Sequence, residues 1–280
     1  DAELKRIASE LWDRGKITPR TARETVGVPP DVEGIPDWIH RRTGDADIYF
    51  VCNQQAQPAR REISFRVTGQ QPELWDAVTG ERRDAAAFTQ QDGRTAVPLE
   101  FPAFGSMFVV FRRAATTNGT GRNSLSLTPV AELTGPWDVT FGKQKLTFQK
   151  LVDWTTRPEV RYFSGTATYR KIFSLPSSAL NHRLYLDLGN LSMLAEVRLN
   201  GKSLGVIWTP PWRLDISDAV RPSGNVLEVD IVNGWWNQLV GDPKHERTQT
   251  NIRLKPGAQP QESGLLGPVT IQAAEKTAVP

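Results

Sequence analysis

The chain has 280 residues, of which 39% are hydrophobic and 23% are charged, and its formal net charge is +3. This length suits about two domains, and the apolar content suffices for packed cores, which excludes wholesale disorder. No run approaches the roughly 18 unbroken apolar residues of a membrane helix, and basic residues are interspersed with acidic ones, so we expect neither a membrane nor a nucleic-acid partner. A single cysteine excludes an internal disulfide framework.

The first 34 residues are predicted to be helical. Apolar residues recur at positions 4, 7, 8 and 11, a spacing typical of an amphipathic helix, and Thr18-Pro19 suits the start of a second short helix. Each helix leaves an apolar stripe that needs a partner surface. We therefore expect residues 1–34 to be the helical tail of a preceding domain, and the chain to be a fragment of a larger protein.

Residues 35–114 are predicted to form a small β-sandwich. A dense apolar run covers Asp47–Cys52, and apolar residues at positions 63, 65 and 67 alternate with polar ones, as in a strand with one buried face. Turn residues between such runs are typical of an antiparallel sandwich. Trp75 is expected to pack on the sheet and Asp76 to cap the following turn; the alternative is that the two form a binding pair.

Residues 115–128 are predicted to be a linker, because small and polar residues dominate without periodicity. Residues 129–275 are predicted to form a jelly roll, since strand patterns follow one another there without intervening helices. Asn200-Gly201 joins two alternating runs and predicts a two-residue hairpin turn with positive φ at both positions. The expected fold class is thus mainly β, with two antiparallel β-sandwiches preceded by a short helical segment.

Nine tryptophans are more than we expect of a chain of this length, and four of them fall in two loop regions. The other five, at positions 12, 38, 75, 137 and 154, are predicted to be core or strand-edge residues. Adjacent tryptophans cannot both point inward on a strand, so at least one of Trp235 and Trp236 is expected to be exposed. Exposed rings beside amide and charged side chains suit carbohydrate, because a ring covers the apolar face of a sugar while polar groups hold its hydroxyls.

The alternative for these four tryptophans is that they seal the sandwich edges or a domain interface. Under the binding hypothesis, the candidate carbohydrate-binding residues are Trp208, Trp212, Arg213, Trp235, Trp236, Asn237 and Asp242.

No catalytic or metal site is predicted. Glycoside hydrolysis usually needs two carboxylates across a cleft, but the acids here fall at turns or on solvent-facing strand positions, such as Glu196, Glu228 and Asp230. Motifs for a nucleophile elbow, a phosphate-binding loop or a zinc protease are absent from the sequence. Calcium is compatible with such a sandwich, but no aspartate-rich loop supports it, so we predict no cofactor.

An ordered series of motifs resembles known glycoside hydrolases. The second β region resembles the sugar-binding jelly-roll domain of glycoside hydrolase family 2, a galactose-binding-like fold, in the segments Arg161–Lys171, Val197–Val206, Trp208–Ser217, Asn233–Asp242 and Ser263–Val269. Together with Trp38–Gly44 and Leu74–Asp76, the series resembles the C-terminal part of α-L-rhamnosidase-type enzymes of glycoside hydrolase family 106.

This resemblance implies the accessory C-terminal region of a bacterial glycoside hydrolase that is periplasmic or secreted. Its acid and base would lie on an upstream (β/α)₈-type catalytic domain, which needs about 250 residues, and no catalytic residue carries over to this chain. The implied partners are that catalytic domain and a rhamnose-containing, plant-type polysaccharide. A free-standing carbohydrate-binding module and a purely structural domain-interface module are the alternatives.

Overall fold

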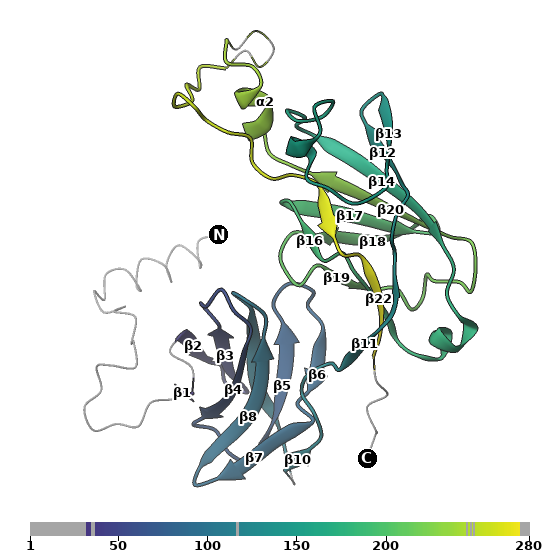
Figure 1. The fold of residues 1–280 in the computed structure, drawn as a ribbon. Helices are drawn as coiled ribbons and strands as arrows, with labels where there is room; N and C mark the ends of the chain where they lie inside the picture. Colours follow the sequence, from purple (N-terminus) through teal and green to yellow (C-terminus); the bar gives the residue numbers. More distant parts are fainter. Residues whose placement is uncertain are drawn as a thin grey trace. The chain divides into compact units, whose positions relative to one another are not determined.

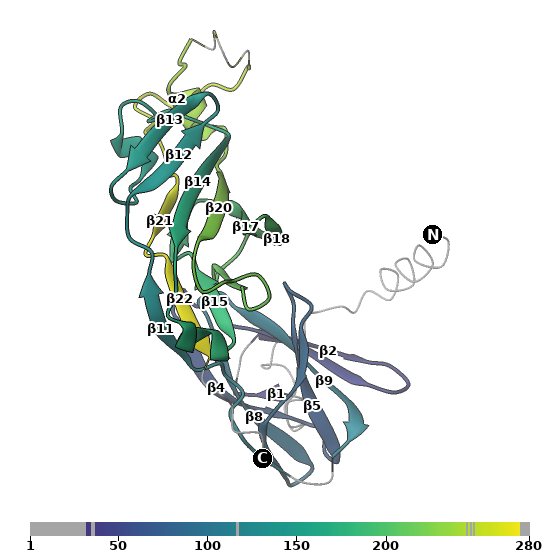
Figure 2. The same ribbon diagram turned by 90° about the vertical axis from the view of Figure 1, so that its right-hand side faces the viewer.

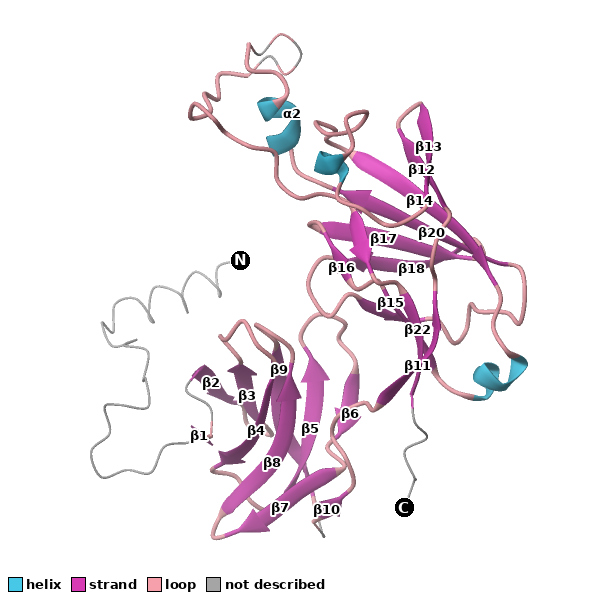
Figure 3. Ribbon diagram, in the orientation of Figure 1, coloured by secondary structure: helices cyan, strands magenta, loops and turns pink. Residues whose placement is uncertain are grey.

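A computed structural model of the chain describes residues 32–34, 37–115, 118–244, 246, 248 and 250–274. The helices predicted within residues 1–34, and Trp12 with them, lie outside the described residues. The chain divides into two compact units, unit 1 (residues 1–124) and unit 2 (residues 125–280). Strands dominate both units (Figures 1 and 3), so the predicted mainly β, antiparallel fold class is confirmed.

Unit 1 contains two five-stranded sheets, with the strand orders β1-β4-β8-β7-β10 and β2-β3-β9-β5-β6. All of the named strand pairs in unit 1 are antiparallel. The strands are β1 Val32–Glu33, β2 Asp37–Arg42, β3 Asp47–Cys52, β4 Ala59–Phe65, β5 Gln70–Asp76, β6 Arg82–Asp84, β7 Ala87–Gln91, β8 Arg94–Phe101, β9 Ser106–Ala114 and β10 Gly119–Thr120.

The core of unit 1 lies between these sheets, where alternate side chains of each strand point inward. Ile63 and Phe65 are fully buried, as their alternation with polar residues predicts. The ring of Phe65 packs against Tyr49 with centroids 4.9 Å apart and against Phe111 with centroids 5.5 Å apart. Aromatic rings in such tilted pairs contribute about 0.5–1.5 kcal/mol beyond the apolar area that they bury.

The turn after β5 forms as predicted. The carboxylate of Asp76 accepts hydrogen bonds from the backbone N–H groups of Val78 (2.8 Å) and Thr79 (2.7 Å). Part of the segment predicted as a linker belongs to unit 1, because β10 pairs with β7. The side chain of Asn123 is buried there and donates to the carbonyl oxygens of Ala87 and Pro98.

Glu73 on β5 has a buried carboxylate that binds three neighbouring side chains of unit 1. It accepts hydrogen bonds from Nε of Arg112 (2.9 Å), Nε of Arg113 (2.8 Å) and Nε1 of Trp75 (3.1 Å). The guanidinium of Arg82 stacks over the Trp75 ring, 4.1 Å from its centroid. Burial by itself would raise the pKa of Glu73, but the hydrogen bonds from the two arginines and the tryptophan outweigh burial and lower the pKa to about 2.

Unit 2 contains a six-stranded sheet, β13-β12-β14-β20-β17-β18, a four-stranded sheet, β11-β22-β15-β19, and the pair β16-β21. Figure 2 shows the same strands from a second side, with the helix α2 at the opposite end of unit 2 from β11, as in Figure 1. The elements are β11 Leu127–Glu132, β12 Trp137–Phe141, β13 Gln144–Phe148, η1 Trp154–Thr156, β14 Thr166–Phe173, η2 Ser177–Asn181, β15 Leu184–Asp187, β16 Asn190–Leu191, β17 Leu194–Leu199, β18 Lys202–Ile207, β19 Arg213–Asp215, β20 Asn225–Val232, α2 Trp236–Val240, β21 Leu265–Gly267 and β22 Thr270–Ala274.

The core of unit 2 buries two of the tryptophans that were predicted to be core residues. Trp137 and Trp154 have no exposed surface, whereas Trp38 and Trp75 of unit 1 are half-buried. Nε1 of Trp154 donates to the hydroxyl of Tyr169 over 2.6 Å. Burial raises the pKa of Tyr169 to about 12, although the hydrogen bond from Trp154 acts in the opposite direction.

The hairpin predicted at Asn200-Gly201 is confirmed. The two residues join β17 to β18, and their φ values are +54° and +80°. A type I′ turn needs this left-handed backbone at both positions, which asparagine and glycine tolerate best. The side chain of Asn200 holds the turn in place, since Nδ2 donates to the carbonyl oxygen of Ala219 (2.8 Å) and Oδ1 accepts from the backbone N–H of Val226 (2.9 Å).

Candidate functional site

Strand register brings the loops that contain Trp208 and Trp235 to one end of unit 2. Val232, the last residue of β20, pairs with Thr166 at the start of β14 and with Leu194 at the start of β17. Ile207, the last residue of β18, pairs with Ala195. The segments after β18 and β20 and those before β14 and β17 therefore leave the sheet at the same end, which we call the loop end.

Trp208 and Trp212 have different environments, although both belong to the loop between β18 and β19. Trp208 directly follows β18 at the loop end, and 62% of its surface is exposed. Trp212 is half-buried and packs against the core of unit 2, and its carbonyl oxygen accepts a hydrogen bond from Leu188. Arg213 begins β19, where its Nε lies 3.6 Å from a carboxylate oxygen of Asp187. Trp208 is thus the member of this loop that presents a free ring.

Trp236 begins the short helix α2, and Trp235 is its N-cap residue. Trp235 is 65% exposed, whereas Trp236 is half-buried and its Nε1 donates to the carbonyl oxygen of Gln259 over 2.8 Å. The prediction that at least one of the two would be exposed is confirmed. The reason differs from the expected one, because the pair lies at a helix start and not on a strand.

Asn237 and Asp242 are buried, and their polar atoms are engaged within the loop. The Asn237 amide accepts from the backbone N–H of Gln261 (2.7 Å) and donates to the carbonyl oxygen of Gln261 (2.8 Å) and to Oγ of Ser263 (3.0 Å). The Asp242 carboxylate accepts from the backbone N–H groups of Glu246 (3.1 Å) and Thr248 (2.7 Å). Both side chains hold the loop together and so shape the surface on which Trp235 stands.

Asn233 and Ser263 extend this scaffold, a role that their sequence motifs did not indicate. The Asn233 amide donates to Oγ of Ser263 (3.1 Å) and accepts from the backbone N–H of Gly165 (2.9 Å). The backbone N–H of Ser263 donates in turn to the carboxylate of Asp153 (2.9 Å). Because the partners are 30 to 110 residues apart in the chain, no local pattern reveals them.

A further exposed side chain, Met193, lies at the loop end. It is 61% exposed and has a left-handed backbone, with φ of +57°, just before β17. A β-carbon placed on Gly234 would lie 3.2 Å from Sδ of Met193, so the methionine rests against the residue that precedes Trp235. Met193, Trp208 and Trp235 form what we call the exposed apolar set.

Three carboxylates on β17 and β20 of the six-stranded sheet are ion-paired with one arginine. Arg198 on β17 lies 2.8 Å from Asp230, 3.7 Å from Glu228 and 3.7 Å from Glu196. The hydrogen bond that Arg198 donates to the Asp230 carboxylate is the main cause that raises the pKa of Arg198. The sequence places these acids on the polar face of their strands but does not show that they converge on one cation.

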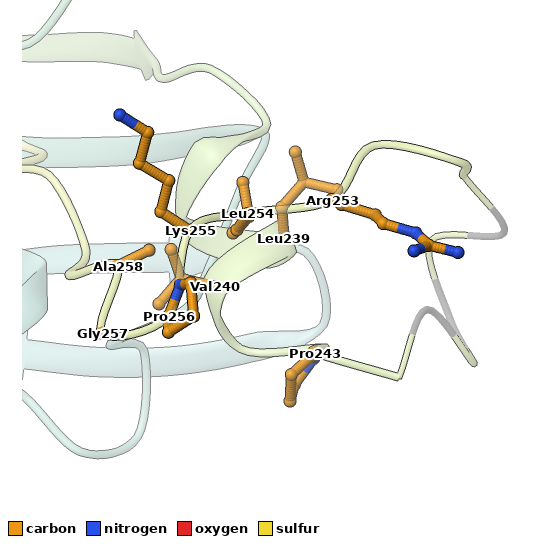
Figure 4. A pocket seen from close by; sticks show the side chains of 9 residues that line it. All are labelled: Leu239, Val240, Pro243, Arg253, Leu254, Lys255, Pro256, Gly257 and Ala258. Carbon is orange, nitrogen blue, oxygen red and sulfur yellow. The ribbon is translucent and has the colours of Figure 1, made fainter.

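A pocket of about 430 Å³ lies beside α2 (Figure 4). Its described lining residues are Leu239, Val240, Pro243, Arg253, Leu254, Lys255, Pro256, Gly257 and Ala258. Apolar side chains and two cationic ones make up this lining, and the two cations were not among the residues predicted from the sequence.

Among the described residues, no three histidine, cysteine or acidic side chains are grouped so that they could hold a metal ion. The helices of the described part of the chain are all too short or too polar to cross a membrane.

Comparisons with known proteins cover both units. Residues 8–90 match the family model described as alpha-L-rhamnosidase (Glyco_hydro_106), and residues 148–262 match the model described as glycosyl hydrolase 2 galactose-binding domain-like. The solved structure of a rhamnosidase from Novosphingobium sp. PP1Y superposes with a TM-score of 0.78 and 34% identity over 95% of this chain. A protein of Formosa agariphila named "Putative beta-glucuronidase" is 37% identical over 176 residues, which cover 50% of this chain.

The chain spans only part of these relatives, namely 26% of the Novosphingobium structure and 15% of the Formosa protein. The two family models match in the order that the sequence motifs predict, with the rhamnosidase model first. The resemblance to α-L-rhamnosidases of glycoside hydrolase family 106 and to the galactose-binding-like domain of glycoside hydrolase family 2 is therefore confirmed.

Proposed function

We propose that this chain is the accessory, non-catalytic C-terminal region of a glycoside hydrolase of the α-L-rhamnosidase type, and that it supports an upstream catalytic domain. The supporting observation is that it resembles a rhamnosidase over 95% of its own length but over only 26% of that enzyme. The ion pairs of Arg198 with Glu196, Glu228 and Asp230 agree with this role, since a catalytic pair of carboxylates must face a substrate across a cleft.

The second part of the proposal is that unit 2 binds a rhamnose-containing polysaccharide at its loop end. The observation that carries it is the exposed apolar set at the loop end, in which Trp235 stands on a buried hydrogen-bonded scaffold and Met193 and Trp208 are also exposed. Large exposed apolar side chains that lie together mark interaction sites. A tryptophan ring offers a sugar a flat apolar surface, while a rigid support lowers the entropy cost of binding.

Tryptophan fluorescence titration with rhamnose-containing oligosaccharides tests the binding proposal. We expect Trp208→Ala and Trp235→Ala each to weaken binding, because each removes a stacking surface. Ile172→Ala is a matched control, since Ile172 is also exposed on unit 2 but lies six residues along β14 from Thr166, about 20 Å from the loop end. Unchanged affinity in both tryptophan variants would refute the proposed site.

An activity assay tests the non-catalytic role separately. We expect the 280-residue chain to leave an aryl α-L-rhamnoside intact, while the longer enzyme hydrolyses it. Release of the aryl group by the chain alone, at a rate proportional to its concentration, would contradict this part of the proposal.

The exposed apolar set also supports a second candidate function, a structural contact with another domain. Aromatic residues and methionine are enriched at protein interfaces, so Met193, Trp208 and Trp235 suit that role as well. Under this alternative, Trp235→Ala would destabilise the longer enzyme and leave sugar affinity untouched. Under the binding proposal, the same variant would lower sugar affinity and keep the melting temperature of the longer enzyme.

A further inference from the structure

The pocket beside α2 is lined by Leu239, which lies four residues after the exposed Trp235. The backbone N–H of Leu239 donates to the carbonyl oxygen of Trp235 over 3.0 Å, so Leu239 lies one helical turn after Trp235, the N-cap residue of α2. Side chains four residues apart share one face of a helix. Leu239 lines the pocket, so the face of α2 that lines the pocket also presents Trp235.

The two walls of the pocket are tied together by hydrogen bonds. One wall is α2 with Pro243, and the other is the segment 253–258. Trp236 donates to Gln259, and Asn237 makes two hydrogen bonds to the backbone of Gln261, just beyond that segment. These hydrogen bonds hold the segment 253–258 beside α2.

The charged side chains that line this pocket are both positive. Arg253 and Lys255 are both exposed, and neither forms an ion pair within the described part of the chain. No carboxylate is found among the described lining residues. A pocket in unit 1 provides a contrast, because there Arg60 lies 3.0 Å from Glu100, which lines the same pocket.

The two cations point in different directions from the pocket (Figure 4). A single carboxylate therefore does not satisfy both of them, whereas an extended chain with an acidic group on successive residues does. Guanidinium and ammonium groups bind carboxylates through charge-assisted hydrogen bonds. Between the cations, apolar side chains such as Leu239 and Leu254 suit the C–H faces of sugar rings.

We propose that this pocket makes the carbohydrate site selective for acidic glycans, with uronate carboxylates at Arg253 and Lys255 and a neighbouring ring stacked on Trp235. The inference rests on the proposed glycan binding of unit 2 and specifies its substrate class. The electrostatic contact distinguishes acidic from neutral glycans. The stacking contact on Trp235 can be made by both kinds of glycan.

Isothermal titration of the 280-residue chain with an oligogalacturonate, and with the same oligosaccharide fully methyl-esterified, tests the proposal. Esterification removes the charge and keeps the sugar rings. We expect the acidic form to bind at least about ten-fold tighter, the range of a hydrogen bond to a charged group. This preference should decrease with added salt, because exposed charges are screened.

The double variant Arg253→Gln/Lys255→Gln is expected to lose this preference and to keep the affinity for the ester. Arg60→Gln/Arg61→Gln is the matched control, because it removes the same formal charge from unit 1. Equal binding of acid and ester, or an equal loss in the control variant, would overturn the acidic selectivity and leave glycan binding intact. Failure of the chain to bind the acid, the ester or a neutral rhamnose-containing oligosaccharide would overturn glycan binding itself.

Discussion

Replacement of Glu73 by glutamine perturbs the buried carboxylate of unit 1 with little change in shape. One oxygen of Glu73 accepts from Nε of both Arg112 and Arg113, and the other accepts from Nη2 of Arg112 and Nε1 of Trp75. A glutamine must place its NH₂ group against one of these pairs of donors. The substitution therefore removes the negative charge and also leaves at least one donor without an acceptor.

The stability that the charged Glu73 contributes follows from its pKa, which is lowered from 4.5 to about 2. At roughly 1.4 kcal/mol for each tenfold change in proton affinity, this contributes about 3 kcal/mol of stability at neutral pH. Because the folded-state pKa is the lower one, the contribution is present above pH 4.5 and is lost as the pH falls toward 2. About 2 kcal/mol of it disappears between pH 7 and pH 3.

Urea unfolding followed by hydrogen exchange and mass spectrometry measures this effect, because peptides from β9 report on unit 1 and peptides from β20 on unit 2. We expect Glu73→Gln to destabilise unit 1 by about 3 kcal/mol at pH 7 and by about 1 kcal/mol at pH 3. Asp84→Asn is the control, since Asp84 is an exposed partner of Arg113, and exposed pairs contribute at most about 1 kcal/mol. If Glu73→Gln lowered the unfolding free energy of unit 1 equally at pH 7 and at pH 3, the reasoning would be refuted.

Three further predictions concern unit 2. Gly264→Ala should destabilise it by more than about 2 kcal/mol in thermal unfolding, because the new methyl group would lie 2.5 Å from Nε1 of Trp154 and Gly264 has φ of +118°. Tyr169 should ionise only near pH 12 in an ultraviolet titration, and since its folded-state pKa is the higher one, stability should fall as the pH rises from 10 toward 12. Asn237→Ala should cost about 1–3 kcal/mol, because it leaves buried groups unpaired, whereas Trp235→Ala should leave the unfolding free energy within about 0.5 kcal/mol of the original value.

Much of the fold could be predicted from the sequence because its signals are local. Alternation of apolar and polar residues specifies which face of a strand is buried, and Asn200-Gly201 specifies a turn that few other pairs adopt. The division of the tryptophans also follows from local context, since Trp137 lies within a strand pattern and Trp208 follows one beside prolines. In these cases the residues nearest in sequence determine the environment.

The details of the candidate site could not be predicted in the same way. Asn237 and Asp242 are the residue types that hold sugar hydroxyls, yet in the structure they bind the loop's own backbone, because Gln261 and Thr248 fold back onto them. Arg253 and Lys255 carry no motif, and they line a pocket only because the segment around them packs beside α2. Whether a loop side chain is scaffold or contact surface depends on tertiary partners that the local pattern does not contain.

The hydroxyl of Ser263 has a consequence for how the loop end moves. It accepts from the amides of both Asn233 and Asn237, and the backbone N–H of the same residue donates to Asp153. Three chain segments therefore meet at one buried residue, and detachment of the Ser263 segment would break all of these hydrogen bonds together. In native-state hydrogen exchange, the backbone amides of Gly165, Gln261 and Ser263 should behave as one cooperative opening unit with a common free energy. The loop end would then open as a whole, so a sugar bound at Trp235 would slow exchange at Gly165 without touching it.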